Sequence, residues 1–128
     1  MEEIKLFICK HCGKIIEKFP GTHGCPTKCC GEDMSELKAN TTDGALEKHV
    51  PAVTVDGNKI HVQVGSIPHP MTEAHYIGFV ILVTDKEVRR HDFAHTDAPE
   101  YTFTIGENEK PLKVYEFCNL HGLWVKEL

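Results

Sequence analysis

The cysteines of this chain are the feature that most limits how it can fold. Five of the six lie before residue 31. Four of these form two close pairs, Cys9 with Cys12 and Cys29 with Cys30. Around them the sequence predicts two short strands, over 3–8 and 14–19, which cannot bury enough apolar surface to stabilise a segment of about 38 residues. A metal ion bound by thiolates would supply the missing cross-link.

Disulfides are the alternative use of these cysteines. The N-terminus is acidic and lacks the apolar run of a signal peptide, so we expect a cytoplasmic protein, in which reducing thiol pools disfavour disulfides. Four thiolates favour a tetrahedral metal site, although the spacing alone does not distinguish iron from zinc. Cys25 could replace a member of the second pair, but an ordinary loop thiol is the simpler interpretation.

Beyond residue 50 the sequence has the two-residue period of β-strands. Apolar side chains alternate with polar ones along 59–64 and 101–105, and Asp56-Gly57-Asn58 predicts a hairpin turn. We expect strands over 52–55, 59–64, 76–83, 87–93, 101–105 and 112–117, with the polar 87–93 strand at a sheet edge. Short strands at this spacing, without a long helical period, predict an antiparallel β-sandwich.

A polar linker over 40–44 separates the cysteine-rich segment from these strands. It predicts a metal module over 1–38 and a second domain over 39–128. At the start of the second domain, Thr42 or Asp43 is suited to cap a single helical turn over 45–47.

The charge and hydropathy of the chain exclude two classes of partner. The net charge is −5 with histidine neutral, whereas a nucleic-acid-binding protein needs a basic face. The chain also contains no apolar run near the roughly 20 residues that span a bilayer. We therefore expect neither nucleic acid nor membrane as a partner.

A second candidate metal site involves residues that are far apart in the sequence. Cys118 and His121 are three residues apart after a predicted strand, so one loop can present a sulfur and a nitrogen to one ion. His49, His69 and His75 stand beside prolines or at strand starts, and a sandwich gathers such positions at its ends. Each histidine taken alone is more often a surface or core residue, and Cys118 could be a buried thiol beside a capping histidine.

Four motifs in the second domain together resemble the desulfoferrodoxin family. They are EKHVP at 47–51, HPM at 69–71, HYI at 75–77 and CNLHGLW at 118–124. The early CxxCG and CCG also resemble that family's four-cysteine module, so the likeness covers nearly the whole chain. It implies an all-β protein, with a small desulforedoxin-like N-terminal metal module followed by an immunoglobulin-like antiparallel β-sandwich.

The resemblance also implies which residues bind two irons. The catalytic iron would have four equatorial histidines and one axial cysteine, and the other iron would have four cysteines. The implied ligands are His49, His69, His75, His121 and Cys118 for the first, and Cys9, Cys12, Cys29 and Cys30 for the second. Glu47 and Lys48 match the two functional side chains beside the open position of the catalytic iron.

Members of this family are superoxide reductases. The resemblance therefore implies reduction of superoxide to hydrogen peroxide at a ferrous centre, with electrons from an external donor such as rubredoxin, in a homodimer. Two other functions remain open at this point. One is an electron carrier that works through its four-cysteine centre without catalysis, and the other is a zinc-binding interaction module with structural histidines.

Overall fold

The computed structural model describes residues 4–21, 24–41, 44 and 46–128. The chain divides into two compact units, residues 1–38 and 39–128. No helix in the described part is long and apolar enough to cross a membrane.

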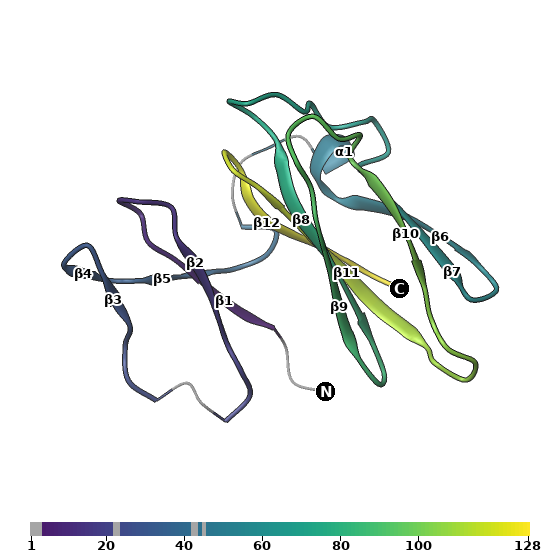
Figure 1. Ribbon diagram of the computed structural model, residues 1–128, viewed down its shortest axis with the longest axis horizontal. Helices are drawn as coiled ribbons and strands as arrows, with labels where there is room; N and C mark the ends of the chain where they lie inside the picture. Colours follow the sequence, from purple (N-terminus) through teal and green to yellow (C-terminus); the bar gives the residue numbers. More distant parts are fainter. Residues whose placement is uncertain (1–3, 22–23, 42–43, 45) are drawn as a thin grey trace. The chain divides into compact units, whose positions relative to one another are not determined.

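The first unit contains five short strands (Figure 1). They are β1 (Lys5–Ile8), β2 (Ile15–Lys18), β3 (Lys28–Cys29), β4 (Glu32–Asp33) and β5 (Ser35–Leu37). Strands β2, β1 and β5 form an antiparallel sheet in that order, and β3 pairs with β4. Among the described residues of this unit, only Leu6, Cys9 and Met34 are buried. So small a core leaves much of the stability of the unit to the four-cysteine group.

The second unit is an antiparallel β-sandwich, as predicted. Its strands are β6 (Pro51–Asp56), β7 (Lys59–Val64), β8 (Ile77–Thr84), β9 (Val88–Asp92), β10 (Glu100–Thr104), β11 (Pro111–Cys118) and β12 (Gly122–Glu127). One sheet has the order β10-β7-β6 and the other β12-β11-β8-β9 (Figure 1). This division into three and four strands is immunoglobulin-like.

The core of the sandwich is built by alternate residues of facing strands. Ile60, Val62 and Val64 of β7 are fully buried, and they belong to one cluster with Val80 of β8 and Val114 of β11. Burying each such side chain stabilises the fold by about 1.5–3 kcal/mol. This apolar layer holds the two sheets together and so fixes the positions of the loops at their ends.

Four strands were not predicted. Three of them, β3, β4 and β5, have only two or three residues each, and β12 has consecutive apolar residues, Leu123 to Val125, instead of an alternating pattern. The 118–122 segment is consequently the turn of a β11–β12 hairpin, in which Cys118 pairs with Gly122. The single helical turn is α1 (Leu46–His49), and the expected caps Thr42 and Asp43 lie outside the described residues. The polar strand β9 does lie at a sheet edge.

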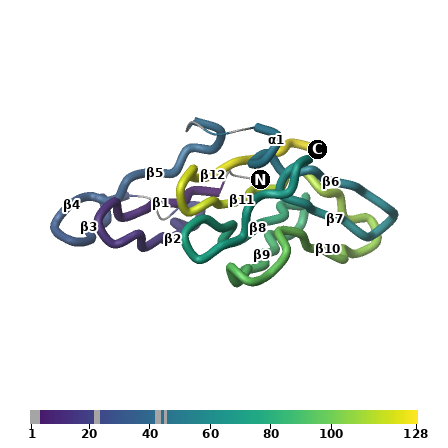
Figure 2. Tube along the Cα trace, turned by 90° about the horizontal axis from the view of Figure 1, so that it is seen from above, coloured from purple at the N-terminus to yellow at the C-terminus, as the bar shows by residue number. Residues whose placement is uncertain are grey.

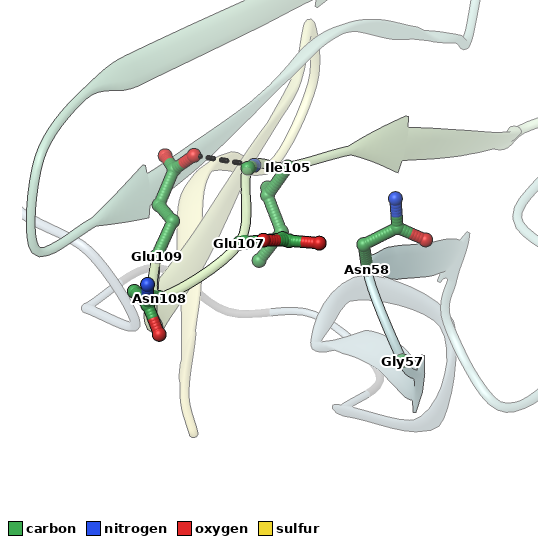
Figure 3. A pocket seen from close by; sticks show the side chains of 7 residues that line it. Gly57, Asn58, Ile105, Glu107, Asn108 and Glu109 are labelled. Atoms are coloured by element: carbon green, nitrogen blue, oxygen red, sulfur yellow. Dashed lines mark hydrogen bonds between the residues drawn. The ribbon is translucent and has the colours of Figure 1, made fainter.

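Where β8 ends, at Thr84, a buried carboxylate joins two turns. Glu109 accepts hydrogen bonds from the Thr84 hydroxyl and the Gly106 backbone N–H, and it forms an ion pair with Arg89 at 3.0 Å. Figure 3 shows its carboxylate bent back toward the 105–109 turn, which lines a pocket with Gly57 and Asn58. The Thr84 hydrogen bond, then the others, lowers the pKa of Glu109 below its ordinary value of 4.5.

We expect Glu109→Gln to lower the unfolding temperature at pH 7. Since the folded-state pKa is lowered, ionised Glu109 stabilises the protein above its ordinary pKa, and this contribution is lost as the pH falls through the lowered pKa. The difference between variant and wild type should therefore shrink on acidification, as thermal melts from pH 7 down to pH 3 would show. Glu107→Gln, at an exposed position of the same turn, is the control; an equal loss there would contradict the assignment.

Candidate metal centres

One end of the sandwich brings together four histidines and one cysteine from five separate places. The side chains come from α1, two positions in the loop between β7 and β8, the end of β11 and the β11–β12 turn. In that order they are His49, His69, His75, Cys118 and His121, and their donor atoms all lie within 4.8 Å of one another. The residues predicted for the second site thus converge, whereas His61 lies apart and bonds to Thr102 at 2.8 Å.

The four imidazoles form a closed ring in which each neighbouring pair meets edge to face. The interplanar angles are 76° for His49 and His69, 82° for His69 and His75, 71° for His75 and His121, and 85° for His121 and His49. His49 Nε2 lies 3.0 Å from His121 Nδ1 and 3.3 Å from His69 Nε2. Four nitrogens about 2.1 Å from a common metal would be about 3.0 Å from their neighbours in a square. The ring therefore fits a metal at its centre.

The thiol of Cys118 adds the fifth donor. Its sulfur lies 3.7 Å from His121 Nδ1, and the residue is fully buried within the sandwich core. Burial raises the pKa of this thiol, while the backbone N–H groups of Leu120 and His121 act in the opposite direction. A metal cation would replace the missing solvation of the thiolate, and the two N–H groups would stabilise it further.

Burial favours the neutral form that metal ligation needs at two of the histidines, His69 and His75. Burial lowers the pKa of His69 to about 4, with smaller effects from the other rings. The Nδ1 of His69 donates to the Pro70 carbonyl at 2.6 Å, which leaves Nε2 as the nitrogen whose lone pair faces the ring of imidazoles. Burial also lowers the pKa of His75, and His75 Nε2 is buried without a hydrogen-bond partner. A buried nitrogen without a partner inside this ring is the clearest sign that a cation belongs there.

Helix α1 is held against the His69 loop by backbone contacts. The Glu47 carbonyl accepts from the Ile67 N–H at 2.9 Å and from the Ser66 hydroxyl at 3.3 Å. A Cβ at Gly65 would lie 2.6 Å from the same carbonyl, so only glycine permits this approach. The contacts place Glu47, with its side chain exposed, and the half-buried Lys48 next to His49.

Two side chains near the site were not identified from the sequence. Trp124 stacks on His49 with ring centroids 5.0 Å apart, and its Nε1 donates to the His121 carbonyl at 3.1 Å. Glu116 is fully buried, neither carboxylate oxygen has a partner, and burial raises its pKa well above the ordinary value. Strand alternation from Val114 to Cys118 would have placed Glu116 in the core, had the strand been assigned with that register.

The four cysteines of the first unit form the second group. The sulfur of Cys29 lies 3.6 Å from that of Cys12 and 4.0 Å from that of Cys30, and all four donor atoms of the group, with that of Cys9, lie within 4.8 Å of one another. Thiolates about 2.3 Å from a tetrahedral metal would be roughly 3.8 Å apart, which matches. None of the cysteines forms a disulfide, and Cys25 is exposed and outside the group.

Tight turns aim backbone N–H groups at these sulfurs. Gly13 and Gly31 follow the two cysteine pairs with φ of 80° and 81°, a region that favours glycine. The N–H of Cys12, with a smaller effect from that of His11, lowers the pKa of Cys9 to about 6. The adjacent thiols of Cys9 and Cys12 raise the pKa of Cys29 to about 12. Four thiolates cannot share this space without a cation, so this group also fits a metal.

Comparison with known proteins agrees with both sites. Residues 41–127 match the family model described as desulfoferrodoxin. A desulfoferrodoxin of Syntrophotalea carbinolica is 41% identical over 98% of each chain. The chain belongs to the desulfoferrodoxin family. The superoxide reductase of Treponema pallidum has a similar structure, with a TM-score of 0.85 and 36% identity over 98% of this chain and 100% of that one.

A second similar structure is shorter and matches only part of the chain. The structure described as a 1Fe superoxide reductase from Giardia intestinalis is 32% identical, with a TM-score of 0.54, over 64% of this chain and 99% of that one. The histidine–cysteine group and the separate four-cysteine group of the present chain match the two iron sites of desulfoferrodoxins.

We expect two irons per chain, each removable by its own cysteine substitution. Cys118→Ser should abolish the thiolate-to-ferric absorption band of the histidine–cysteine iron and leave the four-cysteine iron in place, and Cys29→Ser should do the reverse. Cys25→Ser is the matched control and should keep both. Metal analysis with absorption spectra of the oxidised protein would test this; loss of both irons in Cys118→Ser would show that the sites are not independent.

Proposed function

We propose that this protein is a superoxide reductase, which converts superoxide and two protons to hydrogen peroxide with one electron. The convergence of four imidazoles and one buried thiol, in a chain of the desulfoferrodoxin family, is the observation that carries the proposal. Iron held by these five residues would supply the electron. With a ferrous ion, the five side chains give a net charge of about +1, which attracts the superoxide anion.

Lys48 attracts and orients the anion. Its ammonium group is near enough to His75 for its charge to contribute, after burial and the neighbouring histidines, to the lowered pKa of that ring. A lysine ammonium beside the site would stabilise the negative charge of the superoxide anion. Lys48 is half-buried, so its charge is less screened than that of an exposed lysine.

Glu47 and Cys118 have complementary roles in the proposal. Glu47 is exposed beside Lys48, where its carboxylate would cover the solvent-facing side of the site when no substrate is bound. Cys118 is buried on the core side, where its thiolate would hold the iron and supply electron density that favours release of hydrogen peroxide.

The two units then do different work. Residues 39–128 carry catalysis, and residues 1–38 carry an iron that either relays electrons or stabilises the module. The exposure of Cys12 and Cys30 supports a relay, because an exposed sulfur lets a donor protein come close to the iron.

We further propose a rubredoxin-like donor, a homodimer and a cytoplasmic location. Six cysteines without a disulfide support the cytoplasmic location. Light scattering would measure the assembly.

The experiment that tests the function follows superoxide and its product together. Pulse radiolysis of the reduced protein should show superoxide decay with oxidation of the histidine–cysteine iron and one hydrogen peroxide per superoxide, without oxygen release. Oxygen release would indicate dismutation instead. A chain that only exchanges electrons through its four-cysteine iron, and whose second iron does not react with superoxide, would be an electron carrier.

Lys48→Ala should slow the capture of superoxide by roughly 10-fold or more at low salt, because electrostatic steering raises association rates by factors of about 10 to 1,000. The difference should shrink as salt screens the charge. The control is Lys86→Ala. Lys86 is exposed and follows the end of β8 that is remote from the histidines, and β8 is roughly 24 Å long from Ile77 to Thr84. An equal effect in both variants would show that Lys48 acts only through the net charge of the protein.

A further inference from the structure

The loop that carries His75 is attached to the turn that carries Cys118 and His121 by one asparagine side chain. Asn119 Oδ1 accepts from the Tyr76 backbone N–H at 2.9 Å, and its Nδ2 donates to the Ala74 carbonyl at 2.9 Å. The Asn119 backbone N–H also donates to the Tyr76 carbonyl at 3.2 Å. Figure 2 shows the yellow β11–β12 turn beside the teal loop before β8, where these bonds form.

The carboxamide of Asn119 contacts the peptide groups on both sides of His75. Regular pairing of β11 with β8 ends at Cys118 and Ile77, after a shift in register between Phe117 and Cys118. Beyond that point the side chain of Asn119 replaces the backbone of the missing strand partner. Because one bond needs an acceptor and the other a donor, the carboxamide orientation is fixed, and a carboxylate could make only one of the two.

The peptide groups of His75 itself are held from the other side by Thr72. The Thr72 hydroxyl accepts from the His75 N–H at 3.0 Å, and the Thr72 N–H donates to the His75 carbonyl at 2.9 Å. His75 is therefore fixed along its backbone, while its Nε2 remains without a hydrogen-bond partner in the ring of imidazoles. Of the two contacts, only that with Asn119 joins His75 to the segment that carries other ligands.

We propose that Asn119 is a positioning residue, which sets the location of His75 relative to Cys118 and His121 and thereby controls how tightly the histidine–cysteine site holds its metal. This inference rests on the proposed iron site and not on superoxide as the substrate. Residues that orient ligands typically change metal affinity by about 10- to 100-fold when they are substituted.

The chain contains a closely matched control. Asn40 makes the same three bonds to the edge strand β12: its Oδ1 accepts from the Val125 N–H at 2.9 Å, its Nδ2 donates to the Val125 carbonyl at 3.3 Å, and its N–H donates to the Leu123 carbonyl at 3.0 Å. The bonds of Asn40 flank Trp124, which packs against two ligands, but they reach no peptide group of a ligand itself. Asn119→Asp and Asn40→Asp thus break the same type of bond, and only the first breaks a bond to the peptide groups of a ligand.

The test measures release of iron to a chelator from the oxidised full-length protein. In Asn119→Asp, the histidine–cysteine iron should leave about 10- to 100-fold faster, and its thiolate-to-ferric band should shift because His75 is displaced. The four-cysteine iron of the same chain, as an internal reference, should leave at the wild-type rate. Asn40→Asp should lower the unfolding temperature by a similar amount and leave both the band and the release rates within about twofold of wild type.

Asn119→Leu provides a second measurement, since it removes both side-chain bonds while keeping a similar volume. Backbone hydrogen exchange at Tyr76 should rise in this variant. Wild-type release rates and band position in either Asn119 variant would overturn the proposal, and so would equal acceleration in Asn40→Asp. Rapid release in Asn119→Asp from a protein that does not reduce superoxide would refute the proposed function and still support the positioning role.

Discussion

The structure depends on bringing five electron-rich donor atoms into one small space at the end of a sandwich. Their lone pairs repel one another, and His75 Nε2 has no hydrogen-bond partner to offset its loss of water. A metal cation resolves both problems, whereas the metal-free arrangement is unfavourable in itself. The sandwich must therefore supply the energy that holds the donors together before a metal arrives, and its continuous apolar core does so.

The two units differ in how folding and metal ligation depend on each other. In the first unit few side chains are buried, so ligation by Cys9, Cys12, Cys29 and Cys30 must stabilise the fold. In the second unit the fold positions the ligands, because His49 and His121 are 72 residues apart in the sequence and meet only when both sheets are packed. We therefore expect metal binding to be coupled to folding in the first unit and to follow folding in the second.

The sequence predicted those features that have a local pattern. Alternation along 59–64 and 101–105 predicted strands of the sandwich correctly, and Asp56-Gly57-Asn58 predicted the hairpin between β6 and β7. The same reasoning missed β3, β4 and β5, which are too short for a period to be recognised, and β12, in which the apolar residues are consecutive. The spacing of Cys118 and His121 indicated a metal site, but the complete set of donors came from the family resemblance, because a lone histidine has no local signal of ligation. The buried Glu116 and the contacts of Asn119 depend on register, which composition does not contain.

Regular sheet structure and metal ligation make conflicting demands at the end of β11. A ligand must leave the regular hydrogen-bonding pattern of the sheet to reach the metal. Its neighbouring peptide groups then lose their strand partner and need other hydrogen bonds. Here a register shift at Phe117 and Cys118 frees the chain to turn, and the carboxamide of Asn119 satisfies the peptide groups around His75 that would otherwise be unpaired. Asn40 hydrogen-bonds in the same way to the peptide groups of Val125, which is not a metal ligand. The fold thus uses one general device for closing a sheet edge, and at the metal site this device also fixes the geometry of a ligand.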